Sequence, residues 1–130
     1  MEGHGKPLGF LLTPGQQHDS TVFDELMRTG AVRHSRRRAR NRPRRLVADK
    51  AYSSNAIRHS LARRGIRATI PRRKDEMRPG PFNREAYRQR NLVERCINRL
   101  KQYRRIATRY EKLASNYLAM ITVAAIMLWL

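Results

Sequence analysis

The stretch YRQRNLVERCINRLK, Tyr87–Lys101, holds five basic residues and a single acid, Glu94. On a helix that turns about 100° per residue, four polar side chains fall on one stripe about 60° wide: Tyr87, Arg90, Glu94 and Lys101. The apolar side chains of the stretch lie on a different face. The polar stripe therefore faces a functional site or, as on any amphipathic helix, solvent.

The composition indicates a polyanionic partner. The 130 residues suit one small domain. Lysine and arginine number 29 against 10 aspartates and glutamates, which gives a net charge of +19 and a pI of about 11.6. Of these cations 24 are arginine, whose planar guanidinium can bind two phosphate oxygens at once. We expect nucleic acid as the partner, although any single arginine can simply solvate a helix face.

Cysteine content and hydropathy narrow the class of protein. The single Cys96 excludes an internal disulfide and is typical of a reducing compartment, so we expect a cytoplasmic protein. The closing run YLAMITVAAIMLWL, residues 117–130, is shorter than the roughly 17 to 25 apolar residues that cross a bilayer. It predicts a buried core helix and no membrane partner.

Short apolar runs alternate with helical periodicity along the chain. The pattern predicts strands over residues 7–15, 46–48 and 67–70, and helices over residues 19–30, 53–64 and 83–104. The expected helix caps are Asp19, Ser20, Ser53 and Asn83. Residues 33–45, RHSRRRARNRPRR, hold eight arginines and no acid. Such a run is a solvated loop, a nucleic-acid contact, or both.

Asp49 follows the apolar strand at residues 46–48, at its carboxyl end. Open α/β sheets carry their chemistry at that end of their strands. The alternative is that Asp49 is a turn or capping residue. The residues alone leave the two interpretations equally open.

The spacing of Tyr87, Arg90, Glu94 and Lys101 resembles the Y-R-E-K signature of bacterial insertion-sequence transposases of the DDE class. The segments PLGFLLTPGQQHDS, RLVADKAYSS and RGIRATIPRRK are similar, in that order, to parts of the last two thirds of such a transposase. The resemblance implies that residues 1–130 are the C-terminal part of a DDE transposase catalytic domain, with the arginine-rich loop 33–45 within it. It also implies an α/β fold, a ribonuclease H-like fragment lacking the first strands of the sheet.

The same resemblance implies a role for each matching residue. Asp49, in ADKAY, corresponds to the second catalytic aspartate and Glu94 to the catalytic glutamate, and both bind Mg²⁺ (or Mn²⁺). Phosphoryl transfer with two such ions needs carboxylate ligands, which explains one acid among arginines. Arg90 and Lys101 are implied to contact phosphates of the transposon ends, and Tyr87 to hydrogen-bond to DNA or stack on a base. The complete transposase is expected to be a homodimer.

The family's first catalytic aspartate has no match before Asp49, because it lies on an earlier strand and Asp19 fits a helix cap. We therefore expect a truncated transposase that is inactive alone. In its parent protein it serves DNA transposition through metal-dependent strand cleavage and transfer. The alternatives are a non-catalytic basic DNA- or RNA-binding protein, in which Glu94 is structural, and a remnant without function.

Overall fold

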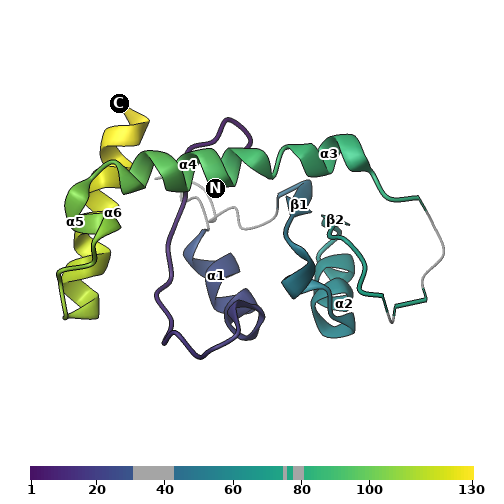
Figure 1. The fold of residues 1–130 in the computed structure, drawn as a ribbon. Coiled ribbons are helices and arrows are strands. Elements are labelled where there is room, and N and C mark those ends of the chain that lie inside the picture. Colours follow the sequence, from purple (N-terminus) through teal and green to yellow (C-terminus); the bar gives the residue numbers. More distant parts are fainter. Residues whose placement is uncertain (31–42, 75, 78–80) are drawn as a thin grey trace, which may run out of the picture.

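The computed structural model describes residues 1–30, 43–74, 76–77 and 81–130 (Figure 1). In these ranges helices surround a small parallel sheet, so the predicted α/β class is confirmed. The elements are two 3₁₀ turns, η1 (Asp19–Val22) and η2 (Lys50–Tyr52), the strands β1 (Arg45–Val47) and β2 (Arg67–Thr69), and the helices α1 (Phe23–Thr29), α2 (Asn55–Arg63), α3 (Arg84–Arg88), α4 (Asn91–Lys101), α5 (Arg104–Ala107) and α6 (Ala114–Trp129).

The sheet is formed by β1 and β2, which run parallel and are connected through α2. Leu46 lies opposite Ala68 and Val47 opposite Thr69. The N–H of Ala48 extends the pairing by donating to the Thr69 carbonyl at 3.3 Å. Both predicted strands are confirmed to within one residue. Residues 31–42, most of the predicted arginine-rich loop, lie outside the described ranges.

One hydrophobic cluster supports the sheet from α1 and α2. Its buried members are Phe23, Ile57, Leu61, Ile66 and Ile70. Leu61 is completely buried, and α2 packs against β2. This cluster holds the carboxyl end of β1 in place, because Leu46 and Ala48 pack against it.

A second cluster joins the two long helices. Cys96 and Leu100 of α4 are buried together with Ala124 of α6. Phe10, from the N-terminal segment, packs against them. The Trp129 indole N–H donates to the Pro7 carbonyl at 2.8 Å, so the N-terminal segment is fastened to the end of α6.

The predicted strand over residues 7–15 is wrong. These residues are non-helical and pair with no strand in the described part of the chain. A strand needs a neighbour that offers backbone hydrogen bonds, and this segment instead buries Pro7 and Phe10 against helices. It also passes close to α1, since a side chain on Gly9 would come within 2.9 Å of Thr29 Cγ2.

The predicted helix caps are only partly confirmed. Asn83 caps α3 as expected, its side chain accepting from the Ala86 N–H at 2.8 Å. Ser54, and not Ser53, caps α2. The capping role of Asp19 and Ser20 is wrong, because no side chain caps η1 or α1. The predicted helix over residues 83–104 is divided into α3, α4 and the start of α5.

The closing apolar helix, α6, is confirmed as a core helix on one face only. Ile121, Ala124 and Ala125 are buried, whereas Val123 is 61% exposed and Met127 is 55% exposed. The reason is that α6 is apolar on all sides while its main packing is against α4 and α5. No helix in the described ranges is long and apolar enough to cross a membrane.

Candidate functional site

Asp49 lies two residues after Val47, the last residue of β1, and is the N-cap of the turn η2. Its Oδ1 accepts a hydrogen bond from the Ala51 N–H at 2.8 Å. The capping interpretation of Asp49 is therefore confirmed. The capping bond uses only one of the two carboxylate oxygens of Asp49. The position after a parallel strand therefore leaves the catalytic interpretation open as well.

The surroundings of Asp49 include a second acid and a tyrosine. η1, which contains Asp19, packs against η2. Burial raises the pKa of the Tyr52 hydroxyl, and the negative charges of Asp19 and Asp49 raise it further. Tyr52 therefore stays protonated at neutral pH and can donate a hydrogen bond. The described residues contain no group of three or more histidine, cysteine or acidic side chains that could hold a metal ion.

A nearly buried polar cluster lies next to this turn, and sequence inspection missed it. The Ser53 hydroxyl donates to Glu76 Oε1 at 2.6 Å. Arg58 Nη2 donates to Ser53 Oγ at 2.7 Å and to the Ile70 carbonyl at 3.1 Å. The cluster ties the segment after β2 to the end of the Asp49 turn. The one sequence feature that could have indicated this cluster is Glu76, an acid in the largely basic segment after β2.

The helix that carries the polar stripe changes its pitch between α3 and α4. The N–H groups of Arg90, Leu92 and Val93 each donate to the carbonyl three residues earlier, at 2.9 to 3.0 Å. Bonds of this kind turn the chain by about 120° per residue and not about 100°. The regular spacing of about 100° per residue that placed Tyr87 on the stripe therefore does not hold across the α3–α4 junction.

Arg90 and Glu94 meet on the surface of α4. Arg90 Nη1 lies 3.0 Å from Glu94 Oε1, with the side chains 38% and 55% exposed. Exposed pairs four residues apart on a helix contribute only about 0.3 to 0.5 kcal/mol. The pair can therefore open readily when either residue is offered a stronger partner.

The other two stripe residues do not join this pair. The Tyr87 ring packs on Phe82, with the ring centroids 5.3 Å apart. Lys101 is the last residue of α4 and is exposed. The structure therefore brings together two of the four predicted stripe residues, Arg90 and Glu94. That Asp49 and Glu94 both bind metal ions stays a prediction.

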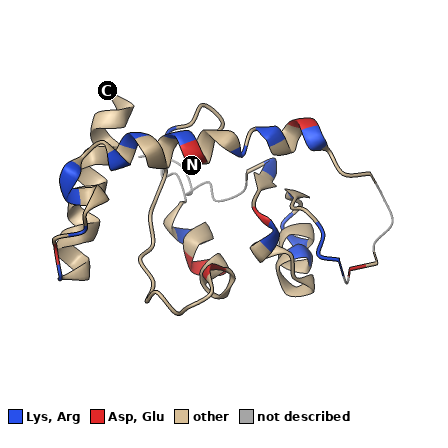
Figure 2. Cartoon of the chain, viewed as in Figure 1, with Lys and Arg blue, Asp and Glu red and all other residues tan. Residues whose placement is uncertain are grey.

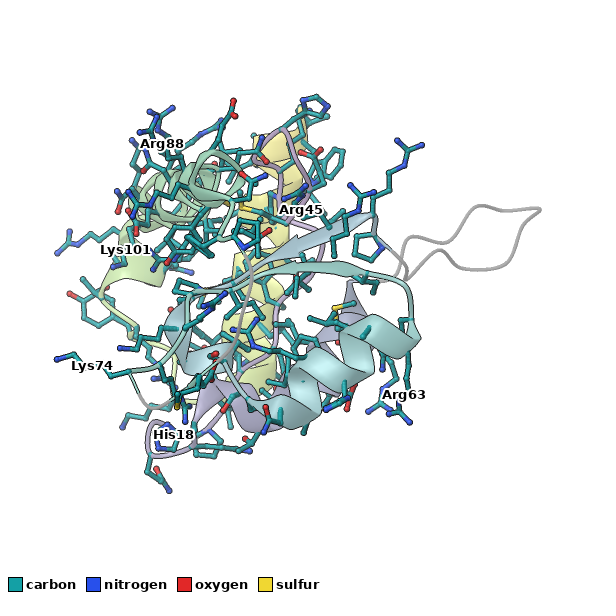
Figure 3. The ribbon with its side chains drawn as sticks, turned by 90° about the vertical axis from the view of Figure 1, so that its right-hand side faces the viewer. His18, Arg45, Arg63, Lys74, Arg88 and Lys101 are labelled. Atoms are coloured by element: carbon teal, nitrogen blue, oxygen red, sulfur yellow. The ribbon has the colours of Figure 1, made fainter. Side chains whose placement is uncertain are left out.

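Basic side chains recur along α3 and α4. Figure 2 shows Lys and Arg at several places on both helices and one acidic position on each, Glu85 and Glu94. In Figure 3, Arg88 and Lys101 project from one edge of the molecule, whereas Arg63 projects from the opposite edge. The outer side of α3 and α4 is thus a cationic surface that an extended polyanion can reach.

The family assignment follows from comparison with known proteins. A family model described as "Transposase DDE domain" matches residues 1–130. The chain belongs to this family of DDE transposases. The predicted membership among insertion-sequence transposases of the DDE class is confirmed, while the Y-R-E-K assignment of individual residues stays a prediction.

Two named transposases are similar to the chain over different shares of their own length. It is 29% identical over 136 residues to the putative transposase for insertion sequence element IS6501 of Brucella ovis, covering 100% of the chain and 93% of that protein. It is 32% identical over 114 residues to the putative transposase for insertion sequence element IS402 of Burkholderia cepacia, covering 87% of the chain but 52% of that protein. No solved structure matches the chain.

Proposed function

We propose that Asp49 and Glu94 are two of the acidic ligands of a metal-dependent DNA strand cleavage and transfer reaction, in the transposition of an insertion sequence. The observation that carries the proposal is the position of Asp49, two residues beyond the carboxyl end of a parallel strand, in a chain that matches the family over all its residues. The proposed complete fold is ribonuclease H-like, with these 130 residues as the C-terminal part of the catalytic domain.

The two carboxylates suit Mg²⁺ or Mn²⁺ chemically. Both ions prefer oxygen ligands, and Mg²⁺ sites commonly use one or two carboxylates together with substrate phosphate. Asp49 keeps one oxygen free of its capping bond, and the partner of Glu94 is a weak surface contact. A bound pair of ions supplies charge stabilisation to both the attacking and the leaving oxygen of the phosphodiester.

The proposed DNA contacts use the residues beside Glu94. Glu94 would hold a metal ion in place of its contact with Arg90, and the Arg90 guanidinium would then be available to bind a phosphate. Lys101, exposed at the end of α4, provides a second phosphate contact, and Tyr87 hydrogen-bonds to DNA or stacks on a base. We further propose that the complete transposase acts as a homodimer on its transposon ends.

Metal binding tests the ligand assignment independently of catalysis. Mn²⁺ is titrated into the wild type, Asp49→Asn, Glu94→Gln and the control Glu85→Gln, which removes an exposed acid from neighbouring α3. The bound fraction is followed by electron paramagnetic resonance. We expect both site variants to weaken Mn²⁺ binding at least about tenfold, because ligating carboxylates are lost, and the control to bind like the wild type. Equal affinities in all four proteins contradict the assignment.

Cleavage of DNA containing transposon ends tests the reaction. The 130 residues alone are expected to cut nothing, and a fusion that adds a segment bearing the family's first catalytic aspartate is expected to cut in the presence of Mg²⁺. In that fusion Glu94→Gln abolishes cutting while DNA binding persists, and Lys101→Ala weakens binding as well. Full cutting by the Glu94→Gln fusion removes Glu94 from the mechanism.

A second candidate function is supported by the Arg90–Glu94 ion pair. If Glu94 only orients Arg90, the chain is a non-catalytic basic DNA- or RNA-binding protein. In that case Glu94→Gln alters nucleic-acid binding but leaves Mn²⁺ binding unchanged. The proposed catalytic role requires the opposite pattern.

A further inference from the structure

A surface hollow of about 290 Å³ lies where α3 meets α4. It is lined by Arg88, Gln89, Asn91, Leu92 and Arg95. Its arginines do not belong to the stripe that contains Glu94, because Arg95 follows Glu94 directly and is rotated by about 100° around the helix. The hollow is therefore a separate feature on the same cationic surface.

The lining has the chemistry of an anion site. Neither Arg88 nor Arg95 forms an ion pair with any acid in the described part of the chain. The side-chain amides of Gln89 and Asn91 add neutral hydrogen-bond donors. The N-terminal segment passes close to Leu92, since a Cβ added at Gly5 would lie 3.7 Å from Leu92 Cδ2. The two guanidiniums thus border a hollow beside the N-terminal segment.

We infer that this hollow binds a phosphate of the DNA backbone, as a second line of contact beside the Glu94 stripe. The inference rests on the proposed function, which provides DNA as the partner. Arg90 already shares its charge with Glu94, whereas Arg88 and Arg95 pair with no carboxylate among the described residues. Arginine also suits the site because its planar fork can bind two phosphate oxygens at once.

The test measures the affinity of the full chain for a fluorescent DNA duplex between 50 and 200 mM KCl. The proteins are the wild type, Arg88→Gln, Arg95→Gln, the double variant and the control Arg63→Gln, which removes an exposed arginine from the opposite edge (Figure 3). Each lost phosphate contact reduces the magnitude of the slope of log affinity against log salt by about 0.9. At 0.1 M salt this corresponds to an affinity about eightfold lower, if the affinities are equal at 1 M salt. We expect the slope of the double variant to be smaller by about 0.9, because the one phosphate contact of the hollow is lost, and the slope of the control to be unchanged. Circular dichroism spectra verify that all variants are folded.

The possible results separate the two proposals. A wild type that fails to bind DNA overturns the proposed function, and this inference with it. A wild type that binds DNA, together with a double variant whose slope equals that of Arg63→Gln, overturns only the inference. Inorganic phosphate is titrated in a parallel experiment. If phosphate binds and the double mutation abolishes that binding without changing the DNA slope, the hollow takes free phosphate and its assignment to DNA is wrong.

Discussion

Replacing Glu76 with alanine removes the carboxylate that fastens the segment after β2 to α2. Glu76 Oε1 accepts from the Ser53 hydroxyl at 2.6 Å, and Arg58 Nη2 lies 3.6 Å from Glu76 Oε2. The side chains of Arg58 and Glu76 are only 15% and 14% exposed. The substitution therefore removes the Glu76 carboxylate from beside a largely buried guanidinium.

The cost of this change follows from burial more than from distance. Breaking a fully buried pair costs about 3 to 5 kcal/mol. Arg58 keeps hydrogen bonds to Ser53 and to the Ile70 carbonyl, so we expect a smaller loss of about 2 to 3 kcal/mol. For a chain of this length that lowers Tm by about 6 to 15 °C.

A matched surface pair provides the control. Arg64 Nη2 lies 2.7 Å from Asp24 Oδ1, closer than the Arg58–Glu76 contact, but these side chains are 37% and 62% exposed. Solvent screening limits such pairs to about 0.2 to 1 kcal/mol. Asp24→Ala should therefore lower the free energy of unfolding far less than Glu76→Ala.

Urea unfolding followed by circular dichroism measures both changes. A double-mutant cycle with Arg58→Met isolates the coupling between Arg58 and Glu76. We expect a coupling of at least about 1.5 kcal/mol, against less than about 0.5 kcal/mol for the Arg64–Asp24 cycle. If the exposed pair couples as strongly as the buried one, the reasoning from burial is refuted.

Three further predictions concern the two cores and the N-terminal turn. Leu61→Ala, at a completely buried position, should cost about 2 to 5 kcal/mol in urea unfolding, whereas Leu113→Ala, 61% exposed, should change little. Burial raises the pKa of Cys96, so iodoacetamide should react slowly with the folded chain and rapidly in urea, and equal rates contradict burial of the thiol. Desolvation acts to raise the pKa of the Glu2 carboxyl, but the backbone N–H groups of Lys6 and His4 donate hydrogen bonds to the carboxylate and outweigh this effect. The pKa of Glu2 in the folded chain therefore lies below the ordinary value of 4.5. The Glu2 carboxylate therefore stabilises the fold above pH 4.5 and loses this effect as the pH falls through the folded pKa, and Glu2→Gln should remove that part of the acid-induced fall in Tm.

Local interactions made several elements predictable from the sequence. β1 and β2 were located to within a residue, β1 from its apolar residues Leu46 and Val47 and β2 from its place between Gly65 and Pro71. The predicted end of the helix at residue 64 agrees with α2 to within one residue, and Gly65 follows it with a φ of +64° that other residues rarely adopt. Asn83 caps its helix through an amide that lies three residues away. Each of these signals depends on residues that are close together in the chain, so the sequence alone contains the information.

The candidate site was predictable only in part. The position of Asp49 after a strand and the approach of Arg90 to Glu94 follow from local spacing. The partners of Ser53 do not, because Glu76 is 23 residues further along and meets it only when the chain folds back after β2. The hollow beside Arg95 depends on the altered pitch at the α3–α4 junction, for which the periodicity gave no signal.

The sequence by itself determined the α/β class, the family, the positive charge and the cap of α3 by Asn83. Tertiary structure alone decided that residues 7–15 form no strand. The same apolar pattern suits a strand or an irregular segment buried under a helix, and the choice depends on which partner lies alongside. Here the partner is α6, whose Trp129 donates to the Pro7 carbonyl across 122 positions of the sequence. Periodicity describes which side of a segment is apolar, whereas only the folded chain determines what covers that side.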